Sequence, residues 1–182
     1  DATIQTFPRT VFYPAFYNVA IKGLTTSSTM VVIGTTLQVN VTVKNEGTVP
    51  ETFGVTLTYD SHSIGTQTVT GLAAGATQKL TFNWVTTGVT PGDYTITATA
   101  SQVPGEVYLV DNVKTTIVRV GIAPTLKVEM PVYDAVAKTY TLNVTLLNLD
   151  EKWRAVGFQF RLTYNSTYLQ YLNVTEGPFL QD

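Results

Sequence analysis

The stretch Leu37-Gln38-Val39-Asn40-Val41-Thr42-Val43-Lys44 decides the fold, because apolar and polar side chains alternate strictly along it. A repeat of two residues is typical of an extended strand with one face on a core and the other in water. The same alternation occurs at 55–59, 80–84 and 94–100, where threonine fills most of the polar positions. Its branched Cβ suits a pleated strand and its hydroxyl suits solvent. These stretches predict an antiparallel sheet that is covered on one face.

Turn-forming residues separate the alternating runs at 45–47, 71–75, 91–93 and 104–106, and no segment shows helical spacing. Short strands at this spacing predict an all-β, immunoglobulin-like sandwich over residues 18–121. We expect its strands near 18–24, 29–33, 36–44, 52–59, 62–70, 77–86, 93–101 and 107–120.

A second β unit is expected over residues 122–182. Gly121-Ile122-Ala123-Pro124 is typical of a linker, since proline cannot donate a ladder hydrogen bond. Alternation restarts at 126–130 and continues at 140–146 and 158–162, which indicates about four strands. A unit of this size is marginally stable alone, and an incomplete sheet leaves edges that seek partners.

The first 17 residues form an aromatic N-terminal arm that is interrupted by Pro8 and Pro14. Exposed apolar side chains promote association, so we expect the arm to lie on a surface of its own sandwich or of another subunit. Its candidate interface residues are Ile4, Phe7, Val11, Phe12, Tyr13, Phe16 and Tyr17.

Composition narrows the function further. Hydrophobic residues make up 44% of the 182 residues and charged residues 13%, with a net charge of −2. The charges are spread evenly and form no basic stripe, so nucleic acid is not an expected partner. No apolar run is long enough to span a membrane, and the N-terminus does not resemble a signal peptide. We expect an extracellular or cell-surface protein whose signal peptide has been removed. The absence of cysteine excludes thiol catalysis and thiolate metal sites, although it does not decide the compartment.

No catalytic residues are predicted. His62 is the sole histidine, and Asp60, Ser61 and His62 are sequence neighbours, whereas a catalytic triad needs groups that converge from separate places. We interpret them as a polar hairpin tip. The acidic residues sit singly apart from Asp150-Glu151, and no calcium-binding loop pattern occurs, so neither a glycosidase pair, a metal site nor a cofactor is expected.

N-glycosylation is the chemical modification that the sequence favours. Four sequons begin at Asn40, Asn143, Asn165 and Asn173, although a threonine-rich chain also makes such triplets by chance. Asn40 and Asn143 each lie between apolar residues, so their side chains are expected to face outward. We expect glycans on at least two of the four, and mass spectrometry that found all four unmodified would contradict this.

The ordered motifs VTVKNEG at 41–47, GLAAGATQKLTFNW at 71–84, PGDYTITATA at 91–100 and VPGE followed by DN at 103–112 resemble the CARDB domain. The resemblance covers 18–120 and implies an adhesion-related, immunoglobulin-like module of prokaryotic surface proteins. The same motifs have structural roles, since Asn45 and Gly47 can support a turn with positive φ.

The second unit resembles the first half of a cohesin-like domain, through TLNVTLLNL at 141–149, AVGFQFRLTYNSTYLQ at 155–170 and NVTEGPFL at 173–180. The pairing of the two modules resembles large archaeal cell-surface proteins. In that family the cohesin-like domain continues beyond the position of Asp182.

Three functions remain open at this stage. The first is a structural subunit of a surface filament or surface layer, which neighbouring copies or other surface proteins join by β-strand exchange. The second is a fragment of a large adhesin that acts as a spacer or as a protein- or carbohydrate-binding module. An accessory domain of an enzyme is a third, and only neighbouring sequence would support it.

Overall fold

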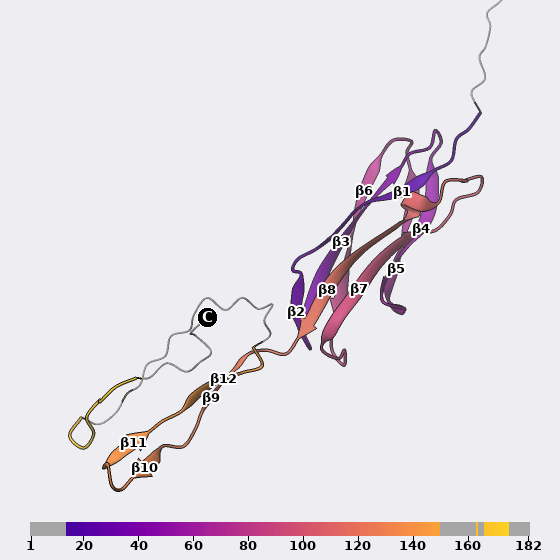
Figure 1. Cartoon of the computed structure of the whole chain (residues 1–182). Coiled ribbons are helices and arrows are strands. Elements are labelled where there is room, and N and C mark those ends of the chain that lie inside the picture. Colours follow the sequence, from indigo (N-terminus) through magenta and orange to yellow (C-terminus); the bar gives the residue numbers. More distant parts are fainter. Residues whose placement is uncertain (1–13, 150–162, 164–165, 175–182) are drawn as a thin grey trace, which may run out of the picture.

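The computed structural model describes residues 14–149, 163 and 166–174 (Figure 1). The regular structure in this part of the chain is β-strand, together with one short 3-10 turn, η1 (Val110–Asn112). A β-sandwich is built from β1 (Val19–Thr26), β2 (Met30–Val32), β3 (Thr36–Asn45), β4 (Glu51–Tyr59), β5 (His62–Leu72), β6 (Thr77–Val85), β7 (Gly92–Ala100) and β8 (Val113–Gly121). Four shorter strands follow it: β9 (Thr125–Val128), β10 (Val132–Asp134), β11 (Thr139–Thr141) and β12 (Val144–Leu147).

The sandwich consists of a three-stranded sheet in the order β1-β3-β6 and a five-stranded sheet in the order β2-β8-β7-β4-β5. Every pairing in the two sheets is antiparallel except that of β2 with β8, which is parallel. The predicted all-β, immunoglobulin-like fold class is therefore confirmed.

The core lies between the two sheets and is made by the alternating residues. Val39, Val41 and Val43 of β3 are fully buried, while their polar neighbours face away from the core. Leu57, Ile96 and Val118 cover them from the opposite sheet and are likewise fully buried. Burial of such side chains is worth about 1.5–3 kcal/mol each, so this layer stabilises the sandwich.

One strand boundary is wrong. A strand was expected from residue 107, but β8 begins at Val113, and residues 107–112 form a loop that ends in η1. The cause is Glu106, whose buried carboxylate accepts the backbone N–H groups of Val19 and Val103. These bonds hold the preceding turn in place, and β8 joins the ladder of β7 only beyond it.

Gly47 is required for a reason other than the expected one. Neither Asn45 nor Gly47 has a positive φ. A Cβ on Gly47 would instead lie 2.5 Å from the carbonyl oxygen of Phe16, too close for any side chain. Asn45 is buried, and its amide oxygen accepts the N–H of Gly47 at 2.9 Å. The turn is therefore shaped by the close approach of the arm.

The strands beyond the linker form two antiparallel ribbons, β9 with β12 and β10 with β11. The strand expected through 140–146 is interrupted at Leu142-Asn143, between β11 and β12. The strand expected at 158–162 lies outside the described residues. We call the described ribbons, residues 125–147, the ribbon unit.

Candidate functional site

The arm joins the sandwich through Phe16 and Tyr17. The Phe16 N–H donates to Thr48 Oγ1 at 2.9 Å, and the Thr48 N–H donates to the Phe16 carbonyl at 2.8 Å. The Tyr17 ring lies against Gly105, where an added Cβ would be 2.9 Å away. These two arm residues therefore contact their own sandwich. Ile4, Phe7, Val11, Phe12 and Tyr13 lie outside the described residues, so their role stays a prediction.

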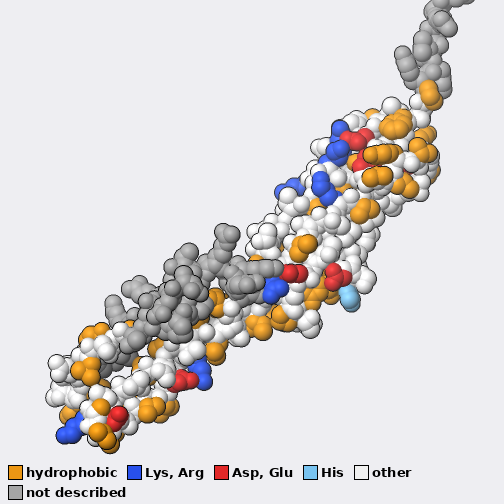
Figure 2. Space-filling model, viewed as in Figure 1, with side chains coloured by type: hydrophobic (Ala, Val, Ile, Leu, Met, Phe, Trp, Pro, Cys, Tyr) orange, Lys and Arg blue, Asp and Glu red, His pale blue; other side chains and the backbone are white. Residues whose placement is uncertain are grey.

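An exposed apolar loop follows Glu106, next to the point where the arm joins. Val107 is 86% exposed and Val110 is 79% exposed, and Tyr108 and Leu109 between them are also exposed. Figure 2 shows hydrophobic side chains gathered at this end of the sandwich. This exposed surface was not predicted, because a strand was expected from residue 107, whereas Val107, Tyr108, Leu109 and Val110 form an exposed loop.

The ribbon unit also exposes apolar side chains. Tyr133 and Tyr140 pair across β10 and β11 with ring centroids 4.8 Å apart, and both are more than half exposed. Val128 and Val132 are exposed to a similar degree. Within the described part of the chain, neither ribbon has a third strand or a second sheet on its face.

We call the end of the sandwich where the arm joins the arm end. A polar cluster lies there. Glu106 is 2% exposed, and its Oε2 also accepts the Asn112 amide at 3.1 Å. Asn18, directly before β1, donates its amide N–H to Asp111 Oδ2 at 3.2 Å. Glu51, 8% exposed, lies near Glu106, and burial together with that neighbouring charge raises the pKa of Glu51. The cluster thus links the start of β1 to η1.

The sequons differ in accessibility. Asn173 is exposed, and so is Asn143, whose amide donates to Glu129 at 3.3 Å. Asn40 is half-buried in the middle strand of its sheet, and its oxygen accepts the Thr81 hydroxyl at 2.9 Å. Asn165 lies outside the described residues. Glycosylation at these sites stays a prediction.

His62 lies where β4 turns into β5, at the opposite end of the sandwich from the arm. Its ring stacks on Tyr59 with centroids 5.0 Å apart. Asp60 does not face it, because the Asp60 carboxylate accepts the Thr95 N–H of β7 at 2.9 Å. Histidine and aspartate therefore serve a two-residue hairpin and its neighbouring strand.

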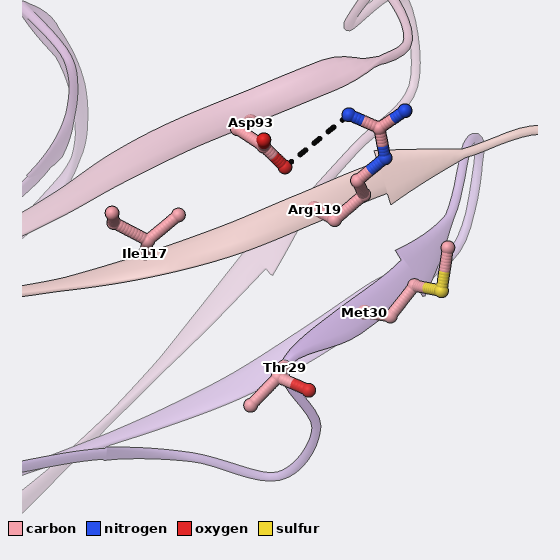
Figure 3. Close-up of a pocket in the computed structure, with 5 residues that line it drawn as sticks. All are labelled: Thr29, Met30, Asp93, Ile117 and Arg119. Atoms are coloured by element: carbon pink, nitrogen blue, oxygen red, sulfur yellow. Dashed lines mark ion pairs between the residues drawn. The ribbon is translucent and has the colours of Figure 1, made fainter. Parts of the chain in front are cut away.

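A shallow hollow lies on the five-stranded sheet (Figure 3). Asp93 on β7 and Arg119 on β8 are cross-strand partners, and their side chains form an ion pair at 3.3 Å. Thr29, Met30 and Ile117 complete the lining. The Asp93 carboxylate thus reaches from β7 across to β8. The ion pair links β7 to β8, next to the edge strand β2. The residues that line the hollow include no nucleophile beside a base.

The part of the chain that the structure describes holds no group of three or more histidine or acidic side chains that could hold a metal ion. No helix among the described residues is long and apolar enough to cross a membrane. The two packed sheets define the class of protein, which is an immunoglobulin-like β-sandwich.

The family follows from the sequence of that sandwich. Residues 19–103 match the model of the CARDB family, so the chain contains a CARDB domain, as its motifs predicted. This family is a non-catalytic domain of surface proteins. The cohesin-like resemblance of the second unit is not supported by any match.

Solved structures similar to the chain include two archaeal domains. A CARDB domain from Pyrococcus furiosus, solved in complex with di-metal ions, is 28% identical over 63% of this chain and 100% of that chain, with a TM-score of 0.49. A domain of a putative cell surface protein from Methanosarcina acetivorans is 24% identical over 58% of this chain and 92% of that chain, with a TM-score of 0.47.

A β-glucosidase from Listeria innocua is 16% identical over 59% of this chain but only 16% of that chain, with a TM-score of 0.44. Similarity to so small a part of an enzyme assigns no activity here. No curated protein matches the sequence.

Proposed function

We propose that the chain is an extracellular structural protein, a subunit of a cell-surface filament or surface layer that assembles by β-strand exchange or complementation between neighbouring copies. The observation that carries this proposal is the ribbon unit. Two-stranded ribbons are marginally stable in water and need a third strand or a packed face. The described ribbons expose Val128, Val132 and the Tyr133–Tyr140 pair instead.

The open edges of the ribbons supply the chemistry of assembly. An added strand satisfies a whole row of backbone N–H and C=O groups, and alternating pockets for its side chains give specificity. The arm, which carries four aromatic side chains at 11–17, is the segment that we propose as the added strand. Head-to-tail contacts that do not close on themselves produce a fibre.

The test is deletion of residues 1–13, which leaves the contacts of Phe16 with Thr48 in place. We expect the full chain to form filaments in negative-stain electron microscopy and the truncated chain to run as a monomer in light scattering. Val128→Lys should also abolish filaments, because it places a charge on the ribbon face. Ile117→Lys is the matched control on an exposed position of the sandwich. A truncated chain that still polymerises would show that the arm is not the joint.

A second function is favoured by the direction of the chain. The arm enters at the end where Asn18 contacts Asp111, and β8 runs from that end to Gly121 at the opposite end (Figure 1). A domain entered at one end and left at the other is suited to act as a spacer in a long adhesin. Monodisperse particles from the full chain at all concentrations would favour this second function over the first.

A further inference from the structure

The arm end of the sandwich contains three buried oxygens for which the described residues supply no hydrogen-bond donor. They are Asn18 Oδ1, Asp111 Oδ1 and Asn112 Oδ1. Asn18 and Asn112 are each 4% exposed. A buried acceptor without a donor costs about 1–3 kcal/mol, so three of them on two adjoining segments need an explanation.

Hydrogen bonds fix the orientation of both amides. The Asn18 amide nitrogen donates to Asp111 Oδ2 at 3.2 Å, so its oxygen is held on the other side of the amide. The Asn112 amide nitrogen donates to Glu106 Oε2 at 3.1 Å. Rotating either amide by half a turn would bring oxygen against a carboxylate oxygen. The acceptor-only character of the cluster therefore follows from its bonding.

The three residues come from two short segments that lie against each other. Asn18 stands directly before β1, and Asp111 and Asn112 belong to η1. Glu106 ties the two segments together, since its carboxylate accepts both the Val19 N–H at 2.7 Å and the Asn112 amide. The hydrogen bond from the Asn18 amide to Asp111 is a second link between the two segments.

The charge of the cluster is negative. Asp111 and Glu106 are carboxylates, and Glu51 adds a third acidic group beside Glu106. Lys22 is the cation that acts on Asp111, but its ammonium is bound to Glu46 at 2.9 Å. Unpaired oxygens in a negative, partly buried place are suited to a hard cation, which accepts electron pairs without needing a donor.

We propose that the arm end binds a calcium ion through the side-chain oxygens of Asn18, Asp111 and Asn112. Amide and carboxylate oxygens are the ligands that calcium takes in proteins, and its flexible coordination tolerates a site made of two amides and one carboxylate, completed by water. Magnesium demands stricter geometry and gives up water reluctantly, so it should bind more weakly. The ion would fasten the residue at the base of the arm to η1, independently of any assembly.

The test is thermal unfolding of the full chain in EDTA, in 10 mM calcium and in 10 mM magnesium at constant ionic strength. A ligand that binds only the folded state raises Tm, and millimolar affinity or better predicts a rise on the order of 5 °C with calcium. An unchanged Tm in calcium, or equal rises with the two ions, would overturn the proposal.

Two substitutions place the effect at these residues. Asp111→Asn keeps the size of the side chain and removes its charge. The affinity for calcium should therefore fall at least tenfold, which would show as a smaller rise in Tm at the same calcium concentration. Asp60→Asn is the matched control, because it makes the same change in the β4–β5 hairpin, where an amide oxygen can still accept the Thr95 N–H. A calcium response in Asp111→Asn equal to that of the unaltered chain would overturn the proposal.

Asn18→Asp tests the site in the opposite direction. It adds a second carboxylate beside Asp111, so the chain should be less stable in EDTA and gain a larger rise in Tm from calcium. This variant keeps the proposal falsifiable if Asp111→Asn fails to fold. A smaller calcium response in Asn18→Asp than in the unaltered chain would count against the site.

Discussion

The sandwich and the ribbon unit are made from the same kind of sequence and have opposite packing. Both alternate apolar and polar residues, as at 37–44 and 126–130. In the sandwich, the apolar side chains of β3 are almost completely buried between two sheets. In the ribbon unit every residue of β9 is exposed. Alternation thus specifies a strand with two different faces, whereas burial requires a second layer on the apolar one.

The difference also extends to the polar groups. Glu106 and Asn45 are buried in the sandwich, each with several hydrogen bonds to the backbone or to amides. The polar contacts of the ribbon unit, such as Lys127 with Glu129 at 3.3 Å, are exposed to water. Exposed pairs contribute little to stability, so the ribbon unit depends on what packs against it.

The largest expected effect comes from matched leucines in the two regions. Leu57 is fully buried and Leu147 is 41% exposed. Leu57→Ala should cost about 3 kcal/mol of unfolding free energy, because it removes buried methyl groups and leaves a cavity. Leu147→Ala should cost less than about 0.5 kcal/mol. Urea unfolding, followed by far-ultraviolet circular dichroism, which reports on the strands of both regions, measures both. A comparable loss in Leu147→Ala would mean that the ribbon unit is packed as tightly as the sandwich.

Matched glutamates give the next effect. The Glu106 carboxylate accepts three hydrogen bonds, and Glu106→Gln would place an amide N–H against one of their donors. This should lower the free energy of unfolding by about 2 kcal/mol. Glu129→Gln, in the ribbon unit, should leave the unfolding transition unchanged, since the Glu129 carboxylate accepts from the exposed side chains of Lys127 and Asn143. Urea unfolding in EDTA keeps cation binding out of the measurement. Equal midpoints for the two variants would contradict the structural role given to Glu106.

The strands of the sandwich could be predicted because one-sided burial leaves a strong mark on the sequence. The runs at 36–44 and 77–86 match β3 and β6 to within a residue. The segment 107–112 could not be predicted, because its conformation follows from Glu106 bonding to Val19, 87 residues earlier in the chain. Contacts between residues so far apart leave no periodicity in the sequence.

The polar cluster at the arm end was missed for the same reason. VPGE at 103–106 and Asp111-Asn112 were recognised as motifs of the domain, and a turn was inferred for the first of them. Their meeting with Asn18 depends on β1 and η1 lying side by side, which the fold alone provides. The exposed face of the ribbon unit could not be predicted either, since alternation does not say what covers a strand.

The smallest expected effect concerns pH, and it has opposite signs in the two regions. Burial and the nearby Glu106 raise the pKa of Glu51 above its ordinary 4.5, so the folded sandwich favours its protonated form. Stability from this group is therefore lost as pH rises from 4.5 through the raised value. Glu51→Gln should stabilise the sandwich at pH 7 by about 1 kcal/mol, the usual cost of a buried unsatisfied group, and the gain should vanish below pH 4.5. Urea midpoints between pH 4 and 7 test this, and a gain that persisted at pH 4 would contradict it.

The acidic groups of the ribbon unit shift the other way. The backbone N–H groups of Ala137 and Val136 donate to Asp134 Oδ1 at 3.0 and 2.8 Å, and they lower the pKa of Asp134 below its ordinary 3.8. Because the pKa of Asp134 is lower in the folded chain, its carboxylate stabilises the turn at pH values above the pKa of the unfolded chain. This stabilisation is lost as the pH falls through the pKa of the folded chain. In an NMR titration, the amide shifts of Val136 and Ala137 should therefore move with a midpoint below 3.8. A midpoint at or above 3.8 would mean that the β10–β11 turn does not form in solution. The comparison would then be sharper still, because the ribbon unit would lack even its local turn until a partner covers it.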